Sequence, residues 1–219
     1  MAKAKIRVFL VDDHPLVRES LTSLINQQDD MEVCGQAEDM ADGLKRIGSL
    51  APDVAIIDIS LKESSGLELV KALKLRFPAT QLVVLSMHDE KLYAERCLRA
   101  GARAYVMKRE STRRIISAIR EVAQGKLFLS DGMATELAQK FVGGKQSGGS
   151  PLEDLSDREL EVFNLLGRGL GTRQVAESLN VSIKTVQAYC ARIKQKMQLG
   201  SATELLREAV RWQEQQSGM

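Results

Sequence analysis

The chain has few aromatic residues, few cysteines and no long hydrophobic run. Phe, Trp and Tyr make up 4% of its 219 residues, and Trp212 is the single tryptophan, so a large aromatic ligand pocket is not expected. Cys34, Cys97 and Cys190 are odd in number and far apart, which argues against a disulfide scaffold and favours reduced thiols. No apolar run reaches the ~18 residues of a membrane span, and the N-terminus lacks the apolar core of a signal peptide. We therefore expect a cytoplasmic protein without a membrane partner.

The sequence also lacks a strong net charge. Its 31 Lys and Arg residues face 29 Asp and Glu residues, so a nucleic-acid surface would have to come from local asymmetry. Hydrophobic residues make up 44% of the chain, enough for a packed core. The length of 219 residues exceeds the ~100–150 residues of one typical domain. Two small domains are therefore expected.

In the first half of the chain, short apolar runs alternate with segments of helical period. Runs such as VAIID and LVVLS are continuously apolar, which is typical of strands covered on both faces of a doubly wound, five-stranded parallel sheet. Such sheets carry their sites at the carboxyl ends of the strands. The expected strands are Ile6–Val11, Glu32–Ala37, Val54–Asp58, Leu82–Ser86 and Ala104–Met107, and the expected helices are Pro15–Gln27, Met40–Leu50, Leu67–Arg76, Glu90–Ala100 and Thr112–Gln124.

The second half has no strand signal. A helix over Ser130–Val142 is followed by GGKQSGGSP, a flexible linker by composition. Two S-x-x-E patterns, Ser156 with Glu159 and Ser201 with Glu204, predict capping boxes at helix starts. The expected helices of this half are Asp157–Leu166, Arg173–Leu179, Ile183–Met197 and Ala202–Gln213. The predicted organisation is a domain over 1–128, a linker helix and linker over 129–151, and a small all-α domain over 152–219.

Five polar residues follow or close the expected strands. Neighbouring carboxylates repel unless a cation neutralises them, and an all-oxygen cluster suits Mg²⁺, while a lysine holds an anionic group. An aspartate presented to a metal and a lysine can attack phosphorus and form an acyl phosphate. The alternative is that the acids only cap the following helices. The five residues are Asp12, Asp13, Asp58, Ser86 and Lys108.

The motifs DDHPLVR, VAIIDISL, SGLELV, LSMHD and AGARAYVMK resemble the flavodoxin-like receiver domain of two-component response regulators. The resemblance implies that Asp58 is the phosphoacceptor, Asp13 a direct Mg²⁺ ligand and Asp12 a ligand through metal-bound water. It also implies that the backbone carbonyl of Ser60 completes the protein ligands. Ser86 and Tyr105 would form the switch pair, although Tyr105 can also be a strand-end packing residue.

Some positions depart from the receiver pattern. Leu61 and Lys62 stand where methionine and proline are common, and Ala104 replaces the usual glycine. We expect Ser60 and His88 to line the path of the water that attacks the phosphorylated Asp58. His14 is interpreted as an exposed loop residue.

Positive charge gathers in the second half. From Gly167 to Gln198, six basic residues face the single acid Glu177, a net charge of +5, whereas Pro151–Glu161 carries five acids and one base. The helix Arg173–Leu179, a short turn and a helix from Ile183 have helix-turn-helix spacing. The outward face of the second helix carries Gln187, Ala188, Ala191, Arg192 and Gln195, which suit a major groove. The alternative is a solvated basic face on a small bundle.

The segment from Leu155 to Met197 closely resembles the LuxR-type helix-turn-helix of the NarL/FixJ class of response regulators. The resemblance implies that Ile183–Gln198 is the recognition helix and Ala202–Gln213 a dimerisation helix. Thr185, Arg192 and Lys196 would contact phosphates. Gly171 stands where a residue with a hydroxyl group is more usual, and Tyr189 stands where a histidine is more usual. The expected DNA-binding set is Lys184, Thr185, Gln187, Ala188, Ala191, Arg192, Lys194 and Lys196.

The sequence thus predicts a transcription regulator controlled by phosphorylation of Asp58 by a sensor histidine kinase, with DNA as its target. A homodimer is expected in the phosphorylated or DNA-bound state, and catalysis is limited to the protein's own acyl phosphate. The alternative is a phosphate-independent regulator whose first domain serves only for dimerisation or partner binding. A free-standing aspartyl-phosphate hydrolase ranks last, because the helical tail supplies no substrate cleft.

Overall fold

The computed structural model describes residues 4–61, 65–87, 90–143, 151–152 and 154–217. The chain forms two compact units, Met1–Phe141 and Val142–Met219. Most of the helix that follows the sheet, residues 131–141 of Asp131–Gly143, belongs to the first unit, and most of the predicted linker lies outside the described residues. The division into 1–128, 129–151 and 152–219 remains a prediction.

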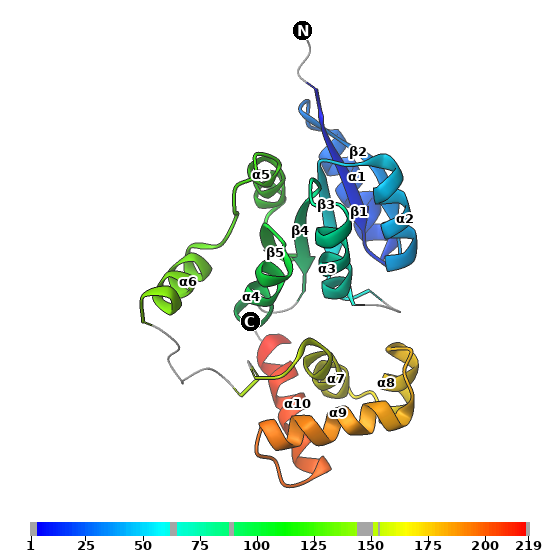
Figure 1. Ribbon diagram of the computed structural model, residues 1–219, viewed down its shortest axis with the longest axis vertical. Helices are drawn as coiled ribbons and strands as arrows, with labels where there is room; N and C mark the ends of the chain where they lie inside the picture. Colours follow the sequence, from blue (N-terminus) through cyan, green and yellow to red (C-terminus); the bar gives the residue numbers. More distant parts are fainter. Residues whose placement is uncertain (1–3, 62–64, 88–89, 144–150, 153, 218–219) are drawn as a thin grey trace. The chain divides into compact units, whose positions relative to one another are not determined.

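The first unit is the predicted five-stranded parallel sheet, in the order β2-β1-β3-β4-β5, with helices on both faces (Figure 1). The expected element ends of this unit are met within one residue, because turn residues mark them in the sequence. The helix expected over Ala202–Gln213 in the second unit, by contrast, continues to Ser217. The strands are β1 (Ile6–Val11), β2 (Met31–Ala37), β3 (Val54–Asp58), β4 (Gln81–Ser86) and β5 (Ala104–Met107). The helices are α1 (Pro15–Asn26), α2 (Met40–Leu50), α3 (Gly66–Arg76), α4 (Glu90–Ala100), α5 (Thr112–Ala123) and α6 (Asp131–Gly143).

Both faces of the sheet are buried. On one face, alternate strand residues pack with α1 and α5, where Ile25 and Ile119 are fully buried. The intervening strand residues point to the opposite face, which accounts for the absence of polar alternation in the strand sequences. All five residues of β3 are buried, including Asp58. The core therefore holds the carboxyl ends of the central strands in fixed positions.

The second unit consists of α7 (Asp157–Gly167), α8 (Thr172–Ser178), α9 (Ile183–Lys196) and α10 (Ala202–Ser217). The first capping box is confirmed: the Glu159 N–H donates to Ser156 Oγ at 3.4 Å, and the Ser156 N–H donates to Glu159 Oε2 at 2.8 Å. The second prediction is only half right. Ser201 Oγ accepts from the Glu204 N–H at 3.1 Å, but the Glu204 carboxylate accepts from the Gly200 N–H at 2.7 Å.

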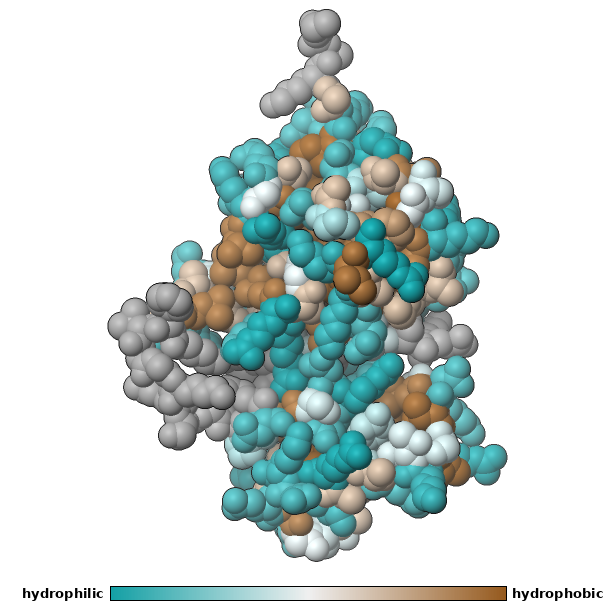
Figure 2. Space-filling view, viewed as in Figure 1, coloured by the Kyte–Doolittle hydropathy of each residue, from teal (hydrophilic) through white to brown (hydrophobic). Residues whose placement is uncertain are grey.

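The surface on the side drawn in Figure 2 mixes hydrophilic and hydrophobic residues. Among the helices of the described residues, none combines the length and the hydropathy needed to cross a bilayer.

Candidate functional site

Polar residues gather where the strands of the first unit end. Asp12 and Asp13 follow β1, Asp58 ends β3, Ser86 ends β4, and Lys108 follows β5. Strands β1 and β3 are neighbours at the point where the strand order reverses, the usual place for a ligand site in such sheets. The three aspartates are 3%, 7% and 2% exposed, respectively. The predicted convergence of polar residues at this edge of the sheet follows from the topology.

Lys108 connects two of the carboxylates. Its Nζ donates to Asp12 Oδ2 at 2.7 Å and to Asp58 Oδ2 at 2.8 Å. Burial raises the pKa of Asp58 above its ordinary value, and Lys108 offsets only part of that rise. Burial alone would lower the pKa of Lys108, but Asp58 and Asp12 outweigh it and raise that pKa. The lysine therefore stays charged beside an aspartate whose ionised form needs further positive charge.

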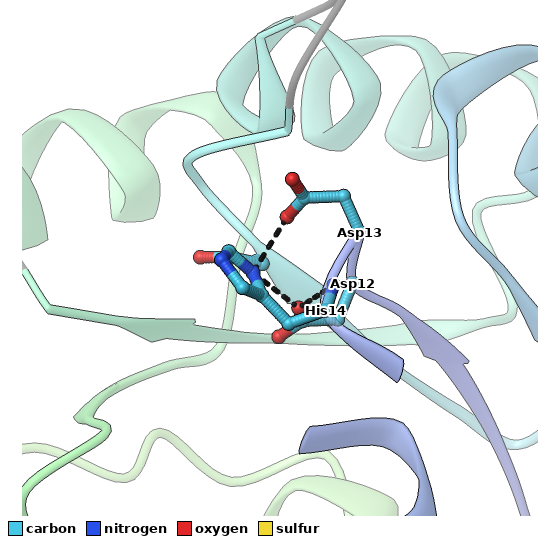
Figure 3. Close-up of side chains that lie close together, drawn as sticks. Asp12, Asp13 and His14 are labelled. Carbon is cyan, nitrogen blue, oxygen red and sulfur yellow. Dashed lines mark hydrogen bonds and ion pairs between the residues drawn. The ribbon is translucent and has the colours of Figure 1, made fainter. Parts of the chain in front are cut away.

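His14 joins this cluster, which the sequence interpretation did not anticipate. Its side chain is 59% exposed, but Nδ1 lies 2.8 Å from Asp13 Oδ1 and 3.2 Å from Asp12 Oδ1 (Figure 3). The prediction of an exposed residue is right, while the contact with both acids was missed. Because His14 directly follows the two acids in the sequence, this proximity could have been suspected.

The donor set fits a hard divalent cation. Ligand atoms of Asp12, Asp13, His14 and Asp58 all lie within 4.8 Å of one another. Three buried carboxylates face one lysine ammonium, so the site carries excess negative charge when all groups are ionised. Carboxylate oxygens are the ligands that Mg²⁺ prefers. Ser60 is near as well, because its N–H donates to Asp58 Oδ1 at 3.2 Å.

Ser86 and Tyr105 lie on the same face of the sheet. Val84 pairs with Tyr105 and Ser86 with Met107, and partners in a parallel ladder point to the same side. Ser86 is 0% exposed and Tyr105 1% exposed, and the Lys108 N–H donates to the Ser86 carbonyl at 2.7 Å. Ser86 thus lies on the strand next to β5, and Tyr105 lies within β5, the strand that leads to Lys108. Ala104, in place of a glycine, is accommodated within the buried strand.

Gly66 is a further residue of the site that the sequence interpretation did not assign. A Cβ atom at this position would lie 2.0 Å from the carbonyl oxygen of Asp58, which is closer than any real contact. The Gly66 N–H also donates to the Ile59 carbonyl at 3.1 Å. The start of α3 thus packs directly against the backbone of Asp58. The glycine of the SGLELV motif was the available signal.

Two residues discussed from the sequence cannot be placed. His88 and Lys62 lie outside the described residues. Leu61, beside Lys62, is buried.

The second unit contains the predicted helix-turn-helix. Val175 and Ala176 of α8 and Val186 and Ile193 of α9 are buried, as the apolar pattern predicts. The Ser182 hydroxyl caps α9 by accepting from the Thr185 N–H at 3.1 Å. Residues exposed along α9 include Lys184, Gln187, Ala188, Ala191, Arg192 and Gln195, while Thr185 and Lys194 are half-buried.

The structure assigns Lys196 an internal partner that the sequence interpretation did not foresee. Its Nζ donates to Glu159 Oε2 at 2.7 Å and to the Asp154 carbonyl at 3.0 Å. The Glu159 side chain is 3% exposed and that of Lys196 38% exposed. Two of the three ammonium donors are thus used to join the end of α9 to the start of α7.

We predict that Glu159→Gln destabilises the second unit by about 1–3 kcal/mol at neutral pH, since it removes a charged hydrogen-bond acceptor. Although burial alone would raise it, the pKa of Glu159 is held below its ordinary value of 4.5 by hydrogen bonds from Lys196 and Ser156. The resulting stability is present above pH 4.5 and is lost as the pH falls through the lowered pKa. Urea unfolding, followed by the fluorescence of Trp212, measures it.

The matched control for this substitution is Glu177→Gln, which removes the exposed ion pair with Arg173 in the same unit. It should change the unfolding free energy by less than about 0.5 kcal/mol. If Glu159→Gln retains the acid-induced loss of stability seen in the unmodified chain, another group is responsible.

Comparison with known families matches both units. Residues 8–120 match the response regulator receiver domain, and residues 153–209 match the bacterial regulatory proteins of the luxR family. The chain belongs to the two-component response regulators. Its domain composition makes it a DNA-binding transcription regulator of a two-component system and not a classical enzyme.

Relatives match this response regulator along its length. The oxygen regulatory protein NreC of Staphylococcus carnosus is 36% identical over 211 residues, covering 94% of this chain and 97% of NreC. NreC of Staphylococcus epidermidis strain ATCC 12228 is 34% identical over 212 residues, with the same coverage.

Solved structures of other response regulators are also similar to this chain. RcsB of Salmonella enterica serovar Typhimurium, bound to promoter rprA with the phosphomimetic BeF3-, has a TM-score of 0.67 at 25% identity, covering 93% of this response regulator and 97% of RcsB. A LuxR-family response regulator of Aurantimonas sp. SI85-9A1 has a TM-score of 0.59 at 28% identity, covering 64% of this chain and 99% of that one.

The cysteines of the response regulator give no sign of activated thiols. Cys97 is buried, and burial raises the pKa of Cys34 and Cys190. A raised pKa keeps a thiol protonated and poorly reactive. Cys190 itself is half-buried on α9.

Proposed function

We propose that a sensor histidine kinase transfers a phosphoryl group to Asp58, and that this group controls DNA binding by the second unit. The observation that carries the proposal is the pair of bonds from Lys108 to Asp58 and Asp12 in a buried, acid-rich site. An aspartate fixed beside a lysine is arranged as a nucleophile whose product anion has a counter-charge ready. Such a geometry is more than helix capping requires.

In the proposed transfer, an Asp58 carboxylate oxygen attacks phosphorus. A P–O bond forms, and the P–N bond to the kinase histidine breaks, with its electron pair leaving on the imidazole. Lys108 offsets the negative charge of the phosphoryl oxygens, and the Ser86 hydroxyl donates a hydrogen bond to one of them. A bound Mg²⁺, held by Asp13, Asp58 and the Ser60 carbonyl and by Asp12 through water, would supply further positive charge.

The acyl phosphate is then hydrolysed at the same site. Water attacks phosphorus, the bond between phosphorus and the Asp58 oxygen breaks, and the carboxylate is restored. Ser60, half-buried beside Asp58, is proposed to line the approach of this water. Only this self-directed reaction is expected from the first unit.

We propose that Ser86 and Tyr105 form a switch that responds to the phosphoryl group on Asp58. A Ser86 hydroxyl drawn toward the phosphoryl oxygen leaves room on its face of the sheet, and the Tyr105 ring occupies the inward position. Tyr105 is 1% exposed, so its side chain is packed within the protein beside the strand that carries Ser86.

For DNA, we propose that α9 enters the major groove. Its exposed face offers two small residues, Ala188 and Ala191, beside one amide, Gln187, so close approach to base edges is possible. The remaining proposed contacts are to phosphates, from Lys184, Thr185, Arg192 and Lys194. Two N–H groups of the Lys196 ammonium donate to Glu159 and Asp154. Only the third N–H is left for the proposed contact with a DNA phosphate.

Gln187→Ala should flatten preference at one base pair in each half-site, because a bidentate glutamine–adenine contact discriminates by ~1–3 kcal/mol. The salt dependence of binding should hardly change. Arg192→Ala is the contrasting variant: it should weaken binding to all sequences and lower the salt slope by about one. Binding-site selection and salt titration measure both. Unchanged base preference in Gln187→Ala would place base reading on Arg192 or Gln195.

A homodimer on DNA is proposed through α10. Leu206 on this helix is 45% exposed, an apolar side chain available to a second copy. Paired α10 helices would place two recognition helices about one turn of DNA apart, ~10 base pairs.

A further inference from the structure

Arg18 lies in the first turns of α1 and contacts the backbone of the acid pair. Its Nη1 donates to the Asp12 carbonyl at 2.5 Å, and its side chain is only 15% exposed. The nearest carboxylate in an ion pair with it is that of Glu38, 3.9 Å away and 70% exposed. The guanidinium is therefore held by the Asp12 carbonyl more than by an acid.

Asp12 has partners for each of its backbone and side-chain polar groups. Its N–H donates to the Ala37 carbonyl at 3.2 Å, Oδ1 accepts from the His14 N–H at 2.8 Å, and Oδ2 accepts from Lys108 at 2.7 Å. The Arg18 bond satisfies the remaining group, the carbonyl. Because Asp12 is 3% exposed, water is a poor substitute for that bond.

The Asp12 carbonyl belongs to the planar peptide unit that leads into Asp13. Fixing this oxygen fixes the plane, and with it the direction in which the Asp13 backbone leaves β1. We propose that Arg18 is a positioning residue for the acid pair, and that it sets the affinity of the site for a divalent cation through the Asp12–Asp13 peptide. The inference rests on the proposed cation site.

Mn²⁺ binding to the full chain tests the inference, with the free ion measured by electron paramagnetic resonance. Arg18→Met should raise the Kd for Mn²⁺ about 10–100-fold, the usual cost of losing a residue that orients metal ligands. Arg18→Lys keeps a positively charged donor group on a shorter side chain, and its Kd for Mn²⁺ should fall between those of Arg18→Met and the unmodified chain. Thermal unfolding followed by circular dichroism is recorded for each variant.

Arg7 provides a matched control. Its Nη1 donates to the Leu50 carbonyl at 2.6 Å, a bond of the same kind at the opposite end of β1. Arg7→Met should lower the unfolding temperature and leave the Kd for Mn²⁺ unchanged. Equal weakening of Mn²⁺ binding in Arg7→Met and Arg18→Met, or unchanged binding in a folded Arg18→Met, would overturn the proposal.

Two further comparisons keep the outcomes separate. If Arg18→Met is unfolded, Arg18→Lys is compared with Arg7→Lys: weaker binding in Arg18→Lys alone supports the inference, and equal binding overturns it. If the unmodified chain does not bind Mn²⁺, or Asp13→Asn binds it equally well, the cation site itself is misassigned. That result differs from one in which Arg18 alone has no effect.

Discussion

Asp58→Asn is expected to abolish uptake of phosphate, and of beryllofluoride as its mimic, because it removes the nucleophilic oxygen next to Lys108. In the unmodified chain, uptake should require Mg²⁺ or a similar hard cation, since burial raises the pKa of Asp58 and Lys108 offsets only part of that rise. Labelling with a phosphodonor and intact-mass measurement report the product. An acyl phosphate is sensitive to hydroxylamine, which identifies the bond.

Asp53→Asn is the matched control for this experiment. Asp53 precedes the same strand, β3, at its opposite end, where its carboxylate accepts from the Arg7 N–H at 2.8 Å. Uptake should persist in this variant. A hydroxylamine-resistant phosphate that survives in Asp58→Asn would show that another residue is the acceptor.

Gly66→Ala should reduce phosphate uptake by about a hundredfold, the order of loss produced by a displacement of about 1 Å in a reacting group. The added methyl group would lie 2.0 Å from the Asp58 carbonyl oxygen, so the strand end or the start of α3 must move. Overpacking of this kind costs about 1–3 kcal/mol of unfolding free energy. Initial labelling rates and circular dichroism measure the two effects.

The same substitution at Gly43 separates the local effect from the general one. A Cβ at Gly43, in α2, would meet Val11 methyl groups at 3.4 and 3.6 Å, which is ordinary contact. Gly43→Ala should therefore keep both the labelling rate and the stability. A normal labelling rate in Gly66→Ala would mean that the Asp58 backbone tolerates the shift and that the close packing of α3 has no functional role.

The fold followed from the sequence because its signals are local and repeated. Continuously apolar runs predict parallel strands, and the carboxyl ends of such strands meet at one edge of the sheet. The sequence alone therefore predicts that Asp12, Asp58 and Lys108 lie close together. The capping residue Ser156 likewise marked the start of α7.

The remaining features depend on contacts that no local pattern encodes. Glu159 and Lys196 are 37 residues apart, and their pairing depends on how α7 crosses α9. The Arg18 bond and the close approach of Gly66 to Asp58 depend on the path of loops after strands. The family resemblance marked Lys196 as a phosphate contact, because a sequence shows the charge of a side chain and not the internal partners of its ammonium group.

DNA affinity of the full chain, with and without beryllofluoride and Mg²⁺, tests the central claim most directly. It is measured at one salt concentration in the unmodified chain and in Asp58→Asn, because phosphate contacts make affinity depend on salt. Control by phosphorylation predicts that beryllofluoride tightens operator binding in the unmodified chain and has no effect in Asp58→Asn. Equal operator affinity in all four conditions would contradict the claim and favour a regulator that acts without phosphate.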